Sequence, residues 1–390
     1  MIRRARAAVT AAALLGTLLG SSTVLAEPDA ADTEKPSLRA RFTDPEDGAL
    51  DASAWLLSRH GFLPVPIIIT EPAVGYGGGI AIAHFSRALA DSPLSPNGRP
   101  QPPSISVGAA AATENGTWVA AIGHLGVWKN DRWRYSGGLG KADVTIKFYL
   151  AAAAGAPGLE YSADAIFLRQ QIERRVGSTD LFVGLRYSWS DLGIRFAEGN
   201  SVPGIGADEY DSRNGGLGAL VTWDGRDNIL SPEHGLYAKV AGSRYSENLG
   251  GDFDYGDLEV NAQGFFRFGE RVGLAAQLVG QFIDGDAPFY GLPFIYLRGV
   301  PMGRYQGHDV ATLEAELRLD FTKRWRLVTF GGVGTAAVAH ERLEEAKRVI
   351  TWGGGFRYLM ARKLGLRMGV DVARGPEKTA FYLVVGSAWR

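Results

Sequence analysis

The sequence has no cysteine and almost no net charge, and each absence excludes a class of protein. Without cysteine, neither disulfides nor thiolate metal sites can form. The chain has 41 Lys and Arg against 42 Asp and Glu, a formal net charge of −1. A balance near zero argues against a nucleic-acid partner, which would select a basic surface.

Long apolar runs and helical periodicity are also scarce beyond residue 60. Charges or glycines break every apolar run there, so no transmembrane helix is expected. The chain has no Gly-x-Ser-x-Gly, His-Glu-x-x-His, phosphate-loop or paired-histidine motif, and its six histidines are scattered. We therefore expect no enzyme, no catalytic residue, no metal site and no cofactor. A barrel hydrolase with an unusual triad has no positive support.

The N-terminus has the three parts of an export signal. Arg3, Arg4 and Arg6 are basic, residues 7–19 are apolar, and Ala26 offers a cleavage site before Glu27. The alternative is a membrane anchor, but the apolar run is shorter than the ~20 residues that a spanning helix needs. The pattern predicts a signal peptide over residues 1–26.

Residues 27–61 form a polar leader with one helical stretch. Leu50–His60 fits a short helix, with Asp51 as its N-cap and Gly61 beyond its end. This helix would be a plug or strut at the periplasmic mouth, or part of a mobile linker. The leader is well under the ~50 residues of an independent domain.

What the chain has in abundance is period-two alternation, which predicts β-strands. Thr312, Glu314, Glu316, Arg318 and Asp320 alternate with Leu313, Ala315, Leu317, Leu319 and Phe321. In a soluble sheet the apolar face would meet a core; in a membrane barrel it would meet lipid, with the charged face lining a wet lumen. We favour the barrel because 52 glycines, strand-end tryptophans and an export signal accompany the pattern.

Sixteen strands fit into residues 62–390. The expected fold is all-β, a sixteen-stranded antiparallel transmembrane β-barrel of the bacterial outer membrane. The expected strand centres are Ile68, Ile80, Val107, Ala120, Ser136, Ile166, Val183, Ala219, Lys239, Val260, Leu278, Leu317, Phe330, Gly355, Met368 and Leu383.

With both termini in the periplasm, strand parity assigns each connection to a side. Residues 129–131, 269–270, 322–323 and 361–362 become short periplasmic turns; residues 142–160, 191–213 and 284–308 become long external loops. The exception is a long periplasmic turn over residues 88–102. Ordinary packing explains any single tryptophan better, but as a set the tryptophans near strand ends fit an interfacial girdle: Trp128, Trp133, Trp223 and Trp325.

Three motifs then carry a family resemblance. They are Leu297-Arg298-Gly299-Val300 in the sixth external loop, Asp224-Gly225-Arg226-Asp227-Asn228 with Pro232 and Gly235 after the eighth strand, and Phe330-Gly331-Gly332-Val333-Gly334 on the thirteenth. Together they resemble the bacterial surface antigen barrels, the superfamily of outer-membrane insertases and two-partner-secretion transporters. The resemblance implies a sixth loop that folds into the lumen and docks on strands twelve and thirteen. Two positions depart from it: Val300 stands at an aromatic position and Gly332 at an aspartate position.

Arg298 is the expected docking cation. Its planar fork suits a carboxylate, and Gly299 lets the backbone approach the wall. Because Gly332 has no carboxylate, we expect Glu316 as the partner, with Glu314 second. Tyr305 would replace the missing aromatic residue. The alternative is a solvated loop arginine.

The turn motif and the seam between the first and last strands have two interpretations each. The turn residues either bind a partner or cap the turn locally. Pro64 and Pro66 cannot donate ladder hydrogen bonds, so with Gly386 and Trp389 they mark a weak seam, or else they only start the strand. We expect Phe381, Leu383, Val385 and Trp389 on one face of the last strand. In the family that the chain resembles, this seam is the gate for client strands.

The expected role is therefore a barrel that assists membrane-protein insertion or translocation, located in the bacterial outer membrane and lacking POTRA domains. Outer-membrane lipid and a client outer-membrane or secreted protein are the expected partners, with a periplasmic recruitment partner or a homo-oligomer. The alternatives are a passive pore or structural barrel and, third, a lipid-modifying enzyme.

Overall fold

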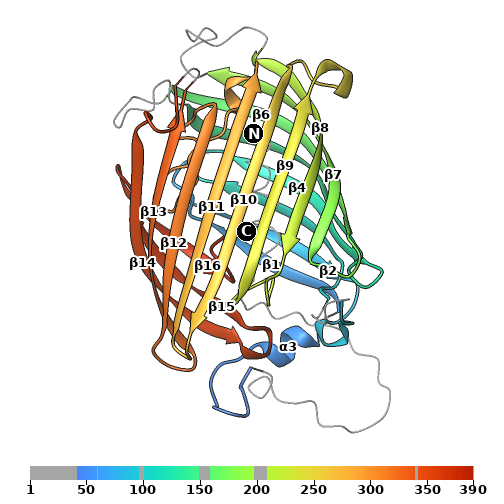
Figure 1. The fold of residues 1–390 in the computed structure, drawn as a ribbon, viewed down its shortest axis with the longest axis vertical. Helices are drawn as coiled ribbons and strands as arrows, with labels where there is room; N and C mark the ends of the chain where they lie inside the picture. The colour runs from blue at the N-terminus through green and yellow to red at the C-terminus, as the bar shows by residue number, and fades with distance from the viewer. Residues whose placement is uncertain are drawn as a thin grey trace.

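The structure, a computed structural model, describes residues 42–58, 60–95, 101–148, 159–196, 209–338 and 341–389. The predicted signal peptide and the first part of the leader lie outside the described residues, and so do residues 96–100 of the expected long turn. Every described strand pairs antiparallel with its neighbour in the chain, and the strands form one tilted wall (Figure 1).

The first half of the barrel comprises eight strands. They are β1 (Gly61–Ile69), β2 (Gly77–Phe85), β3 (Ile105–Thr113), β4 (Trp118–Trp128), β5 (Trp133–Phe148), β6 (Leu159–Arg175), β7 (Leu181–Phe196) and β8 (Asp211–Asp224). The second half comprises β9 (Gly235–Tyr245), β10 (Tyr255–Phe268), β11 (Val272–Gly285), β12 (Asp309–Asp320), β13 (Trp325–Ala337), β14 (Arg348–Ala361), β15 (Leu366–Arg374) and β16 (Thr379–Val385).

Among the described residues, helices are few and short. They are α3 (Ser53–Leu57) and the 3-10 turns η1 (Leu89–Asp91), η3 (Glu247–Leu249), η4 (Phe289–Gly291) and η5 (Arg362–Leu364). The helix in the leader is shorter than expected. Asp51 does not occupy the N-cap position, which Ala52 takes; Asp51 Oδ1 instead accepts from Ser53 N at 2.7 Å. No helix among the described residues is long and apolar enough to cross a bilayer.

The side chains of the barrel wall have the opposite orientation to those of a soluble barrel, with apolar residues outside and charged residues inside, as β12 illustrates. Glu316 and Arg318 are only 3% and 6% exposed, whereas Leu317 is 50% exposed. Charged side chains point into the lumen and apolar ones outward, which is the arrangement of a barrel whose outer surface meets hydrocarbon.

The predicted fold class is confirmed. All sixteen expected strand centres lie within strands, and the structure has the predicted antiparallel order. The expected loop bounds were wrong at several points, because strands continue to Phe148, Phe196 and Gly285 and begin again at Leu159 and Asp211. Charged residues on these projecting strand ends gave the sequence the composition of a loop. The barrel begins at Gly61, one residue before the expected boundary.

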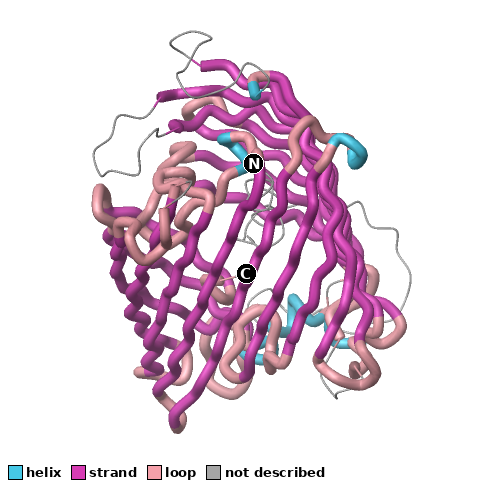
Figure 2. The backbone as a smooth tube through the Cα atoms, turned by 45° about the horizontal axis from the view of Figure 1, so that its top comes forward, coloured by secondary structure: helices cyan, strands magenta, loops and turns pink. Residues whose placement is uncertain are grey.

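The two ends of the barrel differ. We call the end with the connections from even to odd strands the turn end, and the opposite end the loop end. Helix α3 lies at the turn end, at the bottom of Figure 1. Figure 2 shows the strands running around the barrel, with loop and turn segments at both ends.

The sheet does not close by a complete ladder. β1 and β16 stand at the two ends of the strand order, and within the described residues no paired register joins them. Pro64 and Pro66 both lie in β1, paired with Ile82 and Ile80 of β2. Two prolines in a terminal strand leave fewer donors for a partner on the open side.

Candidate functional site

Loop six, residues 286–308 between β11 and β12, folds back into the lumen and places Arg298 against the barrel wall. Arg298 Nη2 lies 2.7 Å from Glu314 Oε1, and Nη1 lies 3.0 Å from Glu316 Oε2. Both expected carboxylates on β12 therefore contact this side chain. A third, Asp371 on β15, lies 2.7 Å from Nη1.

The cluster around Arg298 is balanced in charge. Its carboxylates belong to Glu314, Glu316 and Asp371. Its guanidiniums belong to Arg298, to Arg318, whose Nε is 2.8 Å from Glu316, and to Arg357, whose Nη1 is 2.6 Å from Asp371. Three positive charges thus face three negative ones. Because the groups are at least nine-tenths buried, removing a single charge would leave an uncompensated ion in the lumen.

The other predicted docking residues shape the groove that the loop enters. The Arg298 guanidinium lies 3.5 Å from the centroid of the Phe330 ring, within cation–π range. A Cβ at Gly332 would meet Leu297 Cδ2 at 2.9 Å, and one at Gly334 would meet Ile295 Cγ2 at 2.9 Å. Both glycines therefore make room for apolar side chains of the loop.

Gly299 and Tyr305 anchor the loop beyond Arg298. Gly299 has a φ of 92°, and its N–H donates to Tyr382 Oη at 2.9 Å. Tyr305 is buried and its hydroxyl donates to Glu377 Oε1 at 3.2 Å. Tyr305 shares an apolar cluster with Val300, but the ring against Arg298 is that of Phe330.

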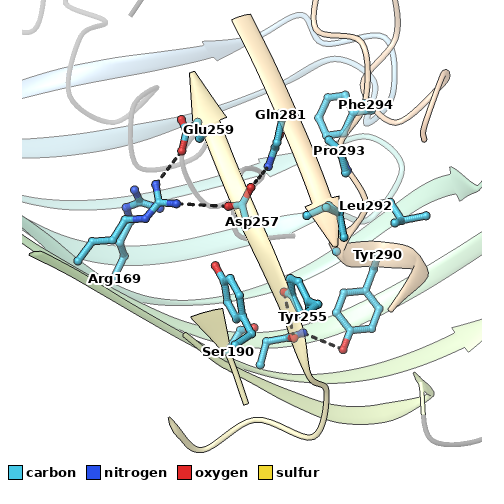
Figure 3. Close-up of a pocket in the computed structure, with 15 residues that line it drawn as sticks. Arg169, Ser190, Tyr255, Asp257, Glu259, Gln281, Tyr290, Leu292, Pro293 and Phe294 are labelled. Atoms are coloured by element: carbon cyan, nitrogen blue, oxygen red, sulfur yellow. Dashed lines mark hydrogen bonds and ion pairs between the residues drawn. The ribbon is translucent and has the colours of Figure 1, made fainter. Parts of the chain in front are cut away.

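The first half of the loop is held in a polar hollow of the lumen wall (Figure 3). The hydroxyl of Tyr290 accepts from Asn214 Nδ2 at 3.0 Å and lies 2.5 Å from Ser212 Oγ, both on β8. Arg186 crosses the hollow to Glu259 at 2.7 Å. The loop is thus fixed to the wall at two separated points, Tyr290 and Arg298.

The tip of loop six reaches over the open seam at the loop end. Met302 N donates to Glu71 Oε1, in the loop between β1 and β2, at 3.2 Å. Arg304 Nη2 lies 2.6 Å from Glu377 Oε1, in the loop between β15 and β16. Loop six therefore contacts both hairpins that flank the seam, β1–β2 and β15–β16. We call the contacts of Met302 with Glu71 and of Arg304 with Glu377 the seam clasp.

A direct contact supports the seam clasp. Lys378 Nζ donates to Pro72 O at 3.3 Å, which joins the two flanking loops without loop six. Burial raises the pKa of the Glu71 carboxyl above its ordinary value, although the hydrogen bond from Met302 N acts in the opposite direction. The clasp thus holds a poorly solvated carboxyl at its centre.

The turn after β8 caps itself locally, as the simpler interpretation expected. Asp227 Oδ1 accepts from Glu233 N at 3.0 Å, and Asn228 Oδ1 accepts from Leu230 N at 2.8 Å. Asp224 Oδ1 lies 2.8 Å from Arg226 Nε, and Gly235 has a φ of 103° that a side chain would strain.

The same turn also crosses the mouth of the lumen at the turn end. Asn228 Nδ2 donates to Leu364 O at 2.8 Å, in η5 between β14 and β15. Pro232 O accepts from Arg318 Nη1 at 2.8 Å. Through these contacts the turn crosses the lumen opening to the opposite side of the barrel. The local sequence alone did not indicate this position.

The expectation for Trp389 was wrong. β16 ends at Val385, Gly386 has a φ of 77°, and the chain turns into the lumen there. Ser387 N donates to Leu230 O of the crossing turn at 2.8 Å, and Trp389 Nε1 donates to Glu314 Oε1 at 2.6 Å. Trp389 therefore does not share the outward face of the last strand; it binds the carboxylate that also holds Arg298.

The described part of the leader is a strap across the turn end. Arg324, in the turn between β12 and β13, lies 2.6 Å from Asp47 and from Asp51. Arg362, in η5, lies 2.6 Å from Asp44. The hydrogen bond from Arg324 lowers the pKa of Asp47 to about 2. Residues 42–57 are thus attached by ion pairs, as a strut would be.

Sequence reasoning missed Asp371, Tyr382 and the inward course of the C-terminal tail. Asp371 does carry a signal, because in Leu366–Arg374 it alternates with Val370 and Val372 and must face the lumen. What the alternation cannot give is which lumenal carboxylate a distant arginine meets. Among the described residues no cluster of His, Cys, Asp and Glu has the geometry of a metal site.

Solved structures with this architecture are distant in sequence. BamA from Haemophilus ducreyi lacking POTRA domains 1-3 matches with a TM-score of 0.58 and 12% identity, over 84% of this chain and 70% of that one. The likeness is one of fold, a sixteen-stranded antiparallel barrel. CdiB from Acinetobacter baumannii and CdiB from Escherichia coli each match with a TM-score of 0.55 and 10% identity over 83% of this chain.

The present chain spans 59% and 61% of the length of the two CdiB chains. No protein-family model and no curated protein matches its sequence. The comparison therefore establishes the fold, and the activity has to be argued from the residues of this barrel.

Proposed function

We propose that this chain is an outer-membrane barrel that helps other proteins insert into or cross that membrane, through a gated seam and without covalent chemistry. The observation that carries the proposal is the seam clasp. Met302 and Arg304 of one loop bind Glu71 and Glu377 on opposite sides of the seam, and Arg298 of the same loop is locked inside the lumen.

Such an arrangement couples two states of the barrel. When Arg298 is docked, the loop tip holds the β1 and β16 hairpins together at the loop end. When Arg298 leaves its cluster, the clasp loses its support and the seam, which has no full ladder, is free to widen. An exposed strand edge then offers backbone donors and acceptors to an extended client segment.

A passive pore is less consistent with the contents of the lumen. The docked loop, the crossing turn and the Trp389 tail all bind lumenal side chains. A large steady conductance requires an open water-filled channel, as in porins. We expect a small, fluctuating conductance instead.

The strap at the turn end bears on recruitment. Residues 42–57 lie at the mouth that would face the periplasm, bound to Arg324 and Arg362. We propose that a separate periplasmic protein delivers the client there. The outer membrane supplies the lipid around the apolar outer face.

The proposal is tested by client insertion in vesicles. An eight-stranded outer-membrane barrel protein, unfolded in urea, is diluted into phospholipid vesicles with or without this chain, and its folding is followed by gel mobility. We expect faster folding with the wild-type chain. Glu377→Gln, which weakens one side of the clasp, should change that rate, whereas Glu247→Gln on exposed η3 should not. A large steady conductance with no acceleration would establish a passive pore instead.

A further inference from the structure

A basic hollow lies on the outside of the barrel at the turn end, apart from the loop-six site. It is formed by two neighbouring turns, residues 129–132 between β4 and β5 and residues 176–180 between β6 and β7. Lys129, Arg132 and Arg174 surround it, with Trp133, Gly177 and Ser178. We call the three cations the basic rim patch.

The two acidic residues of these turns, Asp131 and Asp180, both pair with the buried Arg175, which also lines the hollow. Asp131 is 3% exposed and binds Arg134, at 2.6 Å, and the buried Arg175. Lys129, Asn130 and Asp131 have φ angles of 52°, 56° and 62°, a left-handed run that is costly without glycine. The strained turn points its carboxylate inward and leaves its cations at the rim.

The three cations of the patch are exposed. In the part of the chain that the structure describes, no carboxylate forms an ion pair with Lys129, Arg132 or Arg174. Arg174 instead lies 5.5 Å from the centroid of the Trp133 ring. Three cations around one hollow repel one another, so an anion placed among them would be stabilised.

The position of the patch matches the headgroup layer of a membrane. Trp128 and Trp133 pair across β4 and β5, and Trp128 is 41% exposed. Arg174 has the same parity on β6 as Ile172, which is 40% exposed on the outer face. The cations therefore lie at the end of the apolar belt, beside an aromatic girdle, where lipid phosphates are found.

From this juxtaposition we infer that Lys129, Arg132 and Arg174 form a binding site for the phosphate headgroup of a phospholipid in the periplasmic leaflet. Guanidinium forks suit phosphate oxygens, and Trp133 offers a face for the glycerol and upper acyl region. The inference rests on the proposed outer-membrane orientation, which puts the turn end in the periplasm. A lipid held there would brace the β4–β7 side of the wall, away from the seam.

Native mass spectrometry of the refolded full chain in detergent tests this site. The probes are phosphatidylglycerol, a diacylglycerol with the same acyl chains but no phosphate, and soluble glycerol phosphate. We expect retained phosphatidylglycerol, little diacylglycerol, and weak competition by glycerol phosphate. Replacing all three cations by Gln should lower apparent phosphatidylglycerol affinity by at least about tenfold.

A matched variant removes the same charge elsewhere on the rim. Arg271, Lys323 and Lys363 are exposed cations at three other turns, and their replacement by Gln should leave retention unchanged. Arg132→Lys with Arg174→Lys should keep most of the binding. Folding of each variant is checked by gel mobility, which does not depend on transport activity.

Equal loss in the two triple variants would overturn the site, because it would show general electrostatic attraction. Equal retention of diacylglycerol would overturn it as well, and so would a folded wild-type chain that retains no phosphatidylglycerol. None of these results bears on whether the chain accelerates client insertion. Failure of client insertion with intact lipid retention would count against the proposed function alone.

Discussion

Replacing Arg298 by alanine should release loop six from the lumen. The change leaves three carboxylates facing two guanidiniums, where the wild-type cluster has three of each. An uncompensated buried partner costs about 3–5 kcal/mol, and the lost contact with Phe330 adds about 0.5–2 kcal/mol. At about 1.4 kcal/mol per factor of ten, the docked state should lose at least two orders of magnitude in relative population.

Single-channel conductance in a planar bilayer measures this release. We expect small, flickering openings for the wild type and larger, longer ones for Arg298→Ala. Adding Glu314→Gln to that variant restores the charge balance and should reverse part of the effect. Arg213→Ala is the matched control, because Arg213 is 56% exposed in its pair with Asp252 and such pairs contribute about 0–1 kcal/mol. Identical traces for wild type and Arg298→Ala would refute the conclusion that Arg298 holds loop six in the lumen.

Three further outcomes follow from other contacts. Arg324→Gln removes the cation that binds the strap, so cleavage of residues 42–57 by an added protease should accelerate; unchanged cleavage would contradict the strut. Attachment of the strap lowers the pKa of Asp47 from 3.8 to about 2. The ion pair between Asp47 and Arg324 should therefore be complete above pH about 4 and be lost as the pH drops toward 2, which Trp55 fluorescence can follow. Detachment of the strap near neutral pH would show that another group controls it. Gly332→Asp places a Cβ 2.9 Å from Leu297 and adds an unpaired carboxylate, so the conductance should rise as the loop loosens, and a quieter channel would mean that the new carboxylate recruits Arg298.

The sequence was sufficient for the wall of the barrel. The alternation of Glu316, Leu317 and Arg318 is a local property that determined the strand and its two faces, while the export signal, the glycines and the strand-end tryptophans favoured a membrane barrel over a soluble sheet. The positions of the strand ends were harder to predict from the sequence. Asp143 and Glu160 were assigned to an expected loop but lie on the paired ends of β5 and β6, because charged residues on projecting strand ends give a loop-like composition.

Contacts inside the lumen could be predicted from the sequence only in part. The family resemblance implied that Arg298 docks on β12, and the alternation put Glu314 and Glu316 on the lumenal face of that strand. It did not reveal Asp371, since a lumen brings strands together that are far apart in the chain. Trp389 was misplaced because alternation was extended through Gly386, where a positive φ turns the chain inward.

The central claim is that clients use the seam, and site-specific photo-crosslinking tests it most directly. A photoreactive residue at Ile68 on β1 or Phe381 on β16 is compared with one at Ile350 on β14; all three side chains are exposed on the outer face. During insertion of the eight-stranded client into vesicles, we expect client adducts at Ile68 and Phe381 but not at Ile350. Equal labelling at all three sites, or none at the seam while insertion proceeds, would contradict it.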